Sequence, residues 1–270
     1  MTIQTTYAFD RAVGYPGQPA ESGPHRTKTV LAAVAIAAGL LVLRGETRAK
    51  GYLPTTPDAA DADAIIATGA SAATAQTISG GSLDGAIGGD EMLQPRNLTL
   101  TLSNHANWDA TTAVVTGEDE EGQVIQESFL IPDGGNATVT GVKHFAKVTS
   151  LYIPAQAGAS GTFTLGTGSK LGPITGRYVH GVAMYDASRK PEAYPANYAV
   201  PVIERGPVYV TSETAYEDGD AVYVRFIAVD GETAGVFRNT PDANDCALVK
   251  GARFRRTGSA GVAVIDLNLS

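Results

Sequence analysis

The longest apolar run of the chain lies near its N-terminus. The fourteen residues 30–43 carry no charge, but a membrane-spanning helix needs about 20 apolar residues. Gly39 interrupts the run, which disfavours a single helix by about 1 kcal/mol. A secretion signal would begin close to the start of the chain, whereas 29 mostly polar residues come first. We therefore expect buried strands of a soluble domain, one over 39–45 and another over 30–38 leading into it.

Alternation of apolar and polar residues begins at Asn97. The stretch NLTLTLS alternates leucine with threonine, which is typical of a half-buried strand. Short strands separated by charged or glycine-rich turns predict a small antiparallel sandwich. Because glycine-rich segments flank it, we expect an inserted domain over 93–170. The further strand candidates are 112–116, 124–131, 138–142, 147–153 and 162–165.

A second strand-rich region runs from residue 172 to the end of the chain. Its stretches VPVIERGPVYVTS and DAVYVRFIAV alternate valine with tyrosine, as the wall of a barrel or sandwich does. We expect these strands to close one β-barrel with residues 39–43, so that 27–92 and 171–270 form one body. The predicted fold class is all-β.

Two segments look irregular. Residues 1–26 contain proline and glycine, and we expect an extended arm, either a disordered tail or a segment that orders against a neighbouring subunit through Tyr7, Phe9, Val13 and Tyr15. Residues 57–92 are dominated by small side chains and predict a linker or loop, with a short helix over 59–67 as an alternative.

Composition narrows the function classes. The 270 residues include 20 basic and 28 acidic ones, a net charge of −8, which argues against nucleic acid as a partner. The one cysteine, Cys246, allows no intrachain disulfide, and we expect it to be a small packed hydrophobe. Because the sequence shows neither a secretion signal nor a possible disulfide, we expect synthesis in a reducing cytoplasm.

No motif indicates catalysis, a cofactor or a metal. The acidic run 118–121 predicts a solvated hairpin tip, because adjacent acids on a strand point alternately and cannot converge on one calcium ion. Asp58, Asp61 and Asp63 are also expected in a solvated loop. The four histidines have no metal-ligand spacing, and GTGSK at 166–170 lacks the order of a phosphate loop. Trp108 is expected in the core rather than stacked on a sugar.

The arginine cluster GARFRR leaves two interpretations open. Alternation places Arg253 and Arg255 on one face around Phe254. That face is either a salt-bridging patch for an acidic partner or neighbouring subunit, or an ordinary exposed strand end.

Taken together, the two ends of the chain resemble the structural cement, or head decoration, proteins of tailed bacteriophages. In that family a YPG motif opens the chain, and a strand with an internal glycine follows. RGxVxV and GDxVYVR strands, a GxFR turn and a GARF-like strand come later. The matching positions are Tyr15, Pro16, Gly17, Gly39, Arg205, Gly206, Val208, Val210, Gly219, Asp220, Val222 to Arg225, Gly235 to Arg238 and Gly251 to Phe254.

The resemblance covers residues 7–60 and 172–270, and it implies a jelly-roll-like body on an assembled phage head. The segment 93–170, which compact members lack, resembles the immunoglobulin-like modules of phage surface proteins. The implied function is a non-enzymatic virion protein, made in the host cytoplasm, that bridges major capsid subunits as a homodimer or homotrimer. It implies no cofactor, nucleic acid or membrane partner. The interface residues that we expect are Tyr7, Phe9, Tyr15, Arg253 and Arg255.

Two other functions differ in class. An adhesion protein would bind host glycan through the inserted sandwich and Trp108. A hydrolase of envelope polymers would need paired carboxylates, a metal site or a Cys–His pair, and the sequence offers no such signature.

Overall fold

The protein is described from a computed structural model. The described residues are 14–21, 23–45, 49–55, 59–103, 108–134, 136–188, 193–228, 231–242 and 244–269. Within them the elements are strands apart from one 3₁₀ turn, Gly80–Ser82, which confirms the predicted all-β class. None of the described residues forms a helix long and apolar enough to cross a bilayer.

One nine-stranded sheet takes its strands from both sides of the sequence and forms the part of the protein that we call the body. Its strands are β1 (Arg26–Ala32), β3 (Leu41–Arg44), β4 (Lys50–Tyr52), β13 (Val179–Ala183), β15 (Ala199–Ser212), β16 (Ala221–Arg225), β17 (Phe237–Arg238), β18 (Cys246–Phe254) and β19 (Gly261–Asn268). A small sheet of β2 (Ile36–Ala37) and β14 (Ala193–Tyr194) lies beside it. The apolar run 30–43 thus forms short strands, and Leu41 and Val42 of β3 are fully buried.

The body contains two closed rings of strands rather than the single barrel that we expected. In the first ring the pairings run β15–β1–β4–β3–β13 and return to β15. In the second they run β15–β17–β16–β18–β19 and also return to β15. Closure leaves few open sheet edges, and β15 belongs to both rings.

Strand β15 serves two cores along its length. Val200 and Val202 belong to an apolar cluster of the first ring, whereas Val208 and Val210 belong to a larger cluster that fills the second ring and also includes residues of β3 and β13. Between them Gly206 has a φ of 110°, a left-handed conformation that side chains disfavour. The glycine of the RG motif therefore lies where the strand passes from one core to the other.

Residues 61–171 form two four-stranded sheets, which we call the sandwich unit. One sheet has the order β10 (Ala137–Thr140), β7 (Arg96–Ser103), β12 (Thr162–Leu171), β5 (Asp61–Ala70), and the other β6 (Gln76–Ser79), β11 (Lys147–Ile153), β8 (Thr111–Glu118), β9 (Val124–Ile131). Leucines of β7 and apolar residues of β8, β9 and β11 share one core. The strands predicted between 97 and 165 are confirmed.

The predicted linker over 57–92 is wrong for β5 and β6, and so is the alternative helix over 59–67. Strand β5 pairs with β12, and β6 pairs with β11, so the first boundary of the sandwich unit lies near residue 60 instead of 93. The small residues allow close packing: a Cβ added to Gly69 would collide with the ring of Phe163. Ile65 and Ile66 meanwhile enter the core.

The prediction of an extended N-terminal arm is also wrong for residues 14–21, which the structure describes. Residues 14–21, the edge segment, lie along β15 of their own chain: the amide of Gly17 donates to the carbonyl of Tyr209 (2.7 Å) and that of Ala20 to Pro207 (2.9 Å). The YPG motif makes this docking possible, since Gly17 has a φ of 90° and Pro16 packs directly against Gly39. Proline and glycine here specify a docked turn instead of a free arm.

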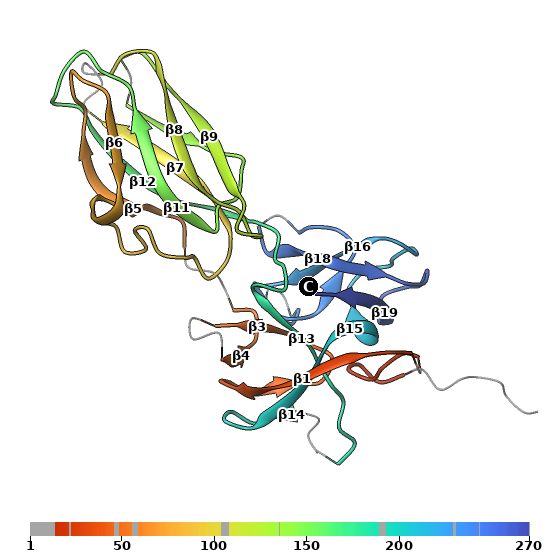
Figure 1. Cartoon of the computed structure of the whole chain (residues 1–270). Coiled ribbons are helices and arrows are strands. Elements are labelled where there is room, and N and C mark those ends of the chain that lie inside the picture. The colour runs from red at the N-terminus through yellow and green to blue at the C-terminus, as the bar shows by residue number, and fades with distance from the viewer. Residues whose placement is uncertain are drawn as a thin grey trace, which may run out of the picture.

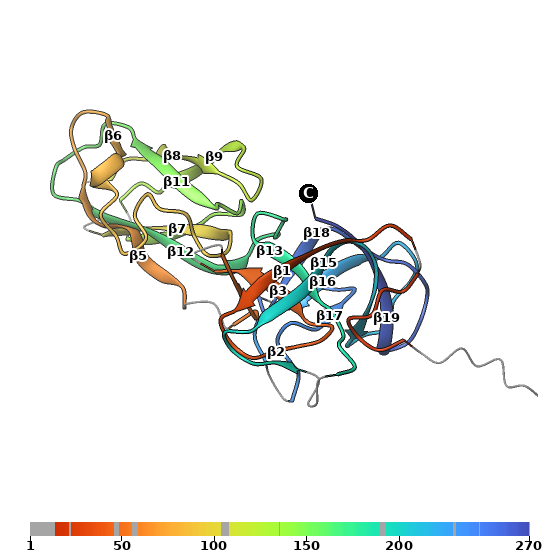
Figure 2. The ribbon, with the colours of Figure 1, turned by 60° about the horizontal axis from the view of Figure 1, so that its bottom comes forward.

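The body and the sandwich unit lie end to end (Figure 1). The edge segment and β19 lie at the end of the body that is far from the sandwich unit, and Figure 2 shows the same order from another side. Each molecule therefore has two distinct ends.

Trp108 is a core residue of the sandwich unit, as expected. Its side chain is 1% exposed, packs edge-on against Phe163 with ring centroids 6.2 Å apart, and donates from Nε1 to the carbonyl of Ser103 (2.8 Å). A buried indole cannot stack on a sugar.

We expect Trp108→Ala to lower the free energy of unfolding by about 3–5 kcal/mol, because the substitution leaves a cavity in the core. Urea unfolding followed by circular dichroism measures the change. The control is Val124→Ala, at a side chain that is 75% exposed, which should stay within about 0.5 kcal/mol of wild type. A Trp108→Ala protein as stable as the control would contradict this assignment.

Candidate functional site

Exposed arginines gather on one face of the body. Arg205 of β15, Arg253 at the end of β18, and Arg255 just beyond it all have exposed side chains. In the ladder Pro207 of β15 pairs with Asp266 of β19, which pairs with Arg253 of β18, so these residues share the outer face. We call this surface the arginine face.

A groove of about 390 Å³ runs across the arginine face. The charged residues that line it are Glu21, Arg205, Arg255 and Asp266. Arg255 lies 3.1 Å from Glu21 of the edge segment, whereas Arg205 makes no ion pair with any residue that the structure describes. The groove therefore combines cationic groups with the backbone of a docked segment.

Three of the five expected interface residues lie within the described ranges, on the edge segment and at the end of β18. Tyr15 begins the edge segment, is 54% exposed and stacks on Tyr185 with ring centroids 5.0 Å apart. Arg255 contacts the other end of the same segment through Glu21. Arg253 donates to the carbonyl of Gly219 (3.2 Å) and has no ion pair within the described ranges.

The alternation around Phe254 is as expected. Phe254 points inward, is 1% exposed and stacks on Tyr216 at 4.6 Å, while the arginines on either side point outward. Tyr7 and Phe9, the other two expected interface residues, lie outside the described residues.

A second arginine cluster is buried, and sequence reasoning missed it. Arg225 is fully buried and holds Glu213 through two hydrogen bonds of 2.8 Å, from Nε and Nη2, and Asp242 through one of 2.9 Å. Arg238 reaches the same Asp242 at 2.7 Å. Hydrogen bonding to Glu213 raises the pKa of Arg225, and hydrogen bonds from Arg225 and Arg238 lower the pKa of Asp242. Both arginines come from the VYVR and GxFR motifs, so these motifs carry a structural ion-pair network.

Other buried titratable groups also fit structural roles. His180 is 4% exposed, with Nε2 3.3 Å from the carbonyl oxygen of Lys50. Burial, together with the charges of Arg44 and Lys28, lowers the pKa of His180 to about 4, so the ring is neutral near pH 7. Burial raises the pKa of the Cys246 thiol, which disfavours the reactive thiolate. Among the described residues, no group of three or more acidic, histidine or cysteine side chains could hold a metal ion.

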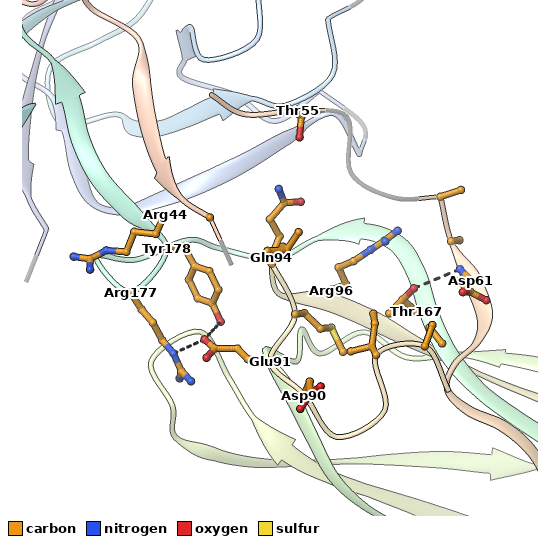
Figure 3. A pocket seen from close by; sticks show the side chains of 18 residues that line it. Arg44, Thr55, Asp61, Asp90, Glu91, Gln94, Arg96, Thr167, Arg177 and Tyr178 are labelled. Carbon is orange, nitrogen blue, oxygen red and sulfur yellow. Dashed lines mark hydrogen bonds and ion pairs between the residues drawn. The ribbon is translucent and has the colours of Figure 1, made fainter. Parts of the chain in front are cut away.

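A larger cavity of about 810 Å³ lies between the body and the sandwich unit (Figure 3). Its polar lining includes Arg44, Arg96, Glu91 and Arg177, and the last two form an ion pair of 2.7 Å. The hydroxyl of Tyr178 donates to the same Glu91 carboxylate at 3.2 Å. Cationic and acidic groups are mixed on its wall, so the lining favours no single ligand charge.

We expect Arg225→Met to lower the free energy of unfolding by about 3 kcal/mol, because the largely buried Glu213 would lose its closest cation and keep only Arg238 at 3.5 Å. Equilibrium unfolding in urea measures this. Arg205→Met, which removes an exposed arginine without an ion pair to a described residue, is the matched control and should change stability by about 0.5 kcal/mol or less. Equal stabilities of the two variants would refute a structural role for the network.

The comparison with protein families gives one match. The model described as "Structural cement protein (E217 gp24/Pam3 gp6)" matches residues 130–268, just over half of the chain. The matched range begins within β9 and includes β15 to β19, with both the arginine face and the buried arginine cluster. The motifs at Tyr15–Gly17 and Gly39 lie outside it.

A comparison with curated proteins found no match. The family match agrees with the resemblance seen in the sequence from Arg205 onward, where the glycines and arginines of the motifs lie. The chain belongs to the phage structural cement protein family, and this membership implies a structural role in the virion in association with the capsid.

Proposed function

We propose that this protein binds the outer surface of a phage head and stabilises the capsid lattice without catalysing a reaction. The observation that carries the proposal is the family match over residues 130–268. The partner is the major capsid protein, and symmetry-related copies of the protein itself form a dimer or trimer. Neither nucleic acid nor a membrane is part of the proposed assembly, and the protein is made in the host cytoplasm.

The arginine face is the proposed surface for the capsid or for a neighbouring subunit. Protein interfaces are enriched in aromatic residues and arginine, and the body carries exposed Tyr15, Arg253 and Arg255. Arg205 and Arg253 have no ion pair with a described residue, so carboxylates of a partner could pair with them. Tyr7 and Phe9 stay candidates for the same interface on the sequence argument alone.

The end-to-end arrangement of the body and the sandwich unit suits this orientation (Figures 1 and 2). The arginine face belongs to the body alone, through Arg205 of β15 and through Arg253 and Arg255 at and just beyond the end of β18. With the arginine face on the shell, the sandwich unit, as an inserted module over 61–171, projects away from it. Many weak contacts repeated by capsid symmetry then give avidity, and no deep pocket is needed.

The alternative of a glycan-binding adhesion protein has lost its main support. That hypothesis used Trp108 as a stacking platform, and the side chain is 1% exposed.

We expect the purified protein to co-sediment with undecorated, expanded heads of its phage, saturably and at a fixed ratio to the major capsid subunit. The variant Arg253→Ala/Arg255→Ala should bind at least about tenfold more weakly, because arginine is enriched among the few interface residues whose truncation costs more than about 1 kcal/mol, and repeated contacts multiply the loss.

The matched control is Lys143→Ala/Lys170→Ala, which removes two cationic side chains from the sandwich unit and should bind as wild type does. Circular dichroism establishes that each variant is folded. Saturable binding that is equal for both variants would remove the arginine face from the proposal. No binding of the wild-type protein to heads would reject the capsid-binding function itself.

A further inference from the structure

The acidic run of the sequence contacts the body of the protein. Residues 119–123 form the turn between β8 and β9, as expected, and Glu121 at its tip has an exposed side chain. Glu120, by contrast, is 6% exposed and its carboxylate forms an ion pair with Lys250 of β18. Glu121 lies 3.0 Å from the same Lys250 Nζ. The expectation of a solvated tip is therefore wrong for Glu120, because a cation far away in the sequence folds onto it.

A second cation of the body meets two more carboxylates of the sandwich unit. The Nε atom of Arg177 lies 2.7 Å from Glu91, and its Nη2 lies 3.5 Å from Glu118 at the end of β8. Figure 3 shows Arg177 and Tyr178 pointing toward Glu91 from the body side of the cavity. In these ion pairs the charges are sorted: the four carboxylates belong to the sandwich unit, and the two cations belong to the body.

Shorter-range contacts surround these ion pairs. The hydroxyl of Thr175 donates to the backbone carbonyl of Glu120 at 3.1 Å, and the backbone amide of Gly172 donates to the carbonyl of Pro95 at 2.7 Å. Ala146, just before β11, is fully buried in the apolar core of the body. A Cβ added to Gly122 would lie 2.8 Å from Arg177 Nη1, so the turn packs closely against this guanidinium.

We propose that the acidic hairpin, which consists of β8, β9 and the turn 119–123 between them, is an ion-pair clamp. Together with Glu91, it holds the sandwich unit in one fixed orientation on the body. The chain enters the sandwich unit before β5 and leaves it after β12, and two such connections alone would allow it to swing. A rotation of the sandwich unit away from the body would break these ion pairs. Each broken pair would leave a carboxylate of the sandwich unit without its cation, so the pairs resist the rotation. Hydrogen bonding to Glu120 also raises the pKa of Lys250, which keeps this amine charged.

The clamp differs from an ordinary surface salt bridge in its burial and geometry. Exposed pairs contribute little because water and salt screen them. Here the Glu120 side chain is 8% exposed, and the Arg177 side chain is 25% exposed and shared between two acids. The inference does not rest on capsid binding, so either proposal can fail without the other.

The test measures the distance between the two units in the full-length protein. Spin labels are attached at Thr77→Cys in the sandwich unit and Ser259→Cys in the body, both exposed, with the buried Cys246 replaced by Ala. Pulsed electron paramagnetic resonance should give one narrow distance distribution for this background. The distribution should broaden in Arg177→Glu/Lys250→Glu, in which all four carboxylates face like charges.

Two further variants make the result decisive. Lys170→Glu reverses an exposed charge that has no ion pair to a described residue and should keep the narrow distribution. The variant Glu120→Lys/Glu121→Lys/Lys250→Glu exchanges the signs of the charges in two of the ion pairs. Because opposite charges still face each other, the distance distribution should also stay narrow. An unchanged narrow distribution in Arg177→Glu/Lys250→Glu would overturn the clamp. If that double variant does not fold, a folded, narrow charge-exchanged protein supports the clamp and a misfolded or broad one overturns it.

Discussion

The structure depends on one shared strand. Strand β15 closes both rings of the body, and its backbone pairs with β1 and β13 along its first half and with β19 along its second. The same strand holds the edge segment through the backbone of Pro207 and Tyr209. Loss of β15 would open both cores at once, so the fold of the two chain ends is coupled through its hydrogen bonds.

Strand β18 takes part in both proposed contacts. Lys250, in the middle of the strand, meets the sandwich unit, and Arg253 near its end and Arg255 just beyond it belong to the arginine face. Four residues separate Lys250 from Arg255 in the sequence. One strand of a closed ring thus joins the proposed capsid surface to the proposed clamp.

The sequence allowed the strands with regular alternation to be predicted, because burial of one face imposes a period of two on residues such as Leu98, Leu100 and Leu102. It failed at β5, where small residues signal close packing against Phe163 as well as they signal a loop. It also failed for the acidic hairpin and for Arg225, since their partners Lys250 and Asp242 are brought near only by the fold. The arginine at the end of a motif was visible; its burial among carboxylates was not.

The central claim is that a cement-family body faces the phage shell with its arginine face while the sandwich unit points away. Electron cryomicroscopy of expanded heads decorated with the protein tests this most directly. The account predicts density for β15, β18, β19 and the edge segment against the major capsid protein, and density for the sandwich unit outermost in one orientation. Heads on which the sandwich unit contacts the shell, with the arginine face exposed to solvent, would contradict it.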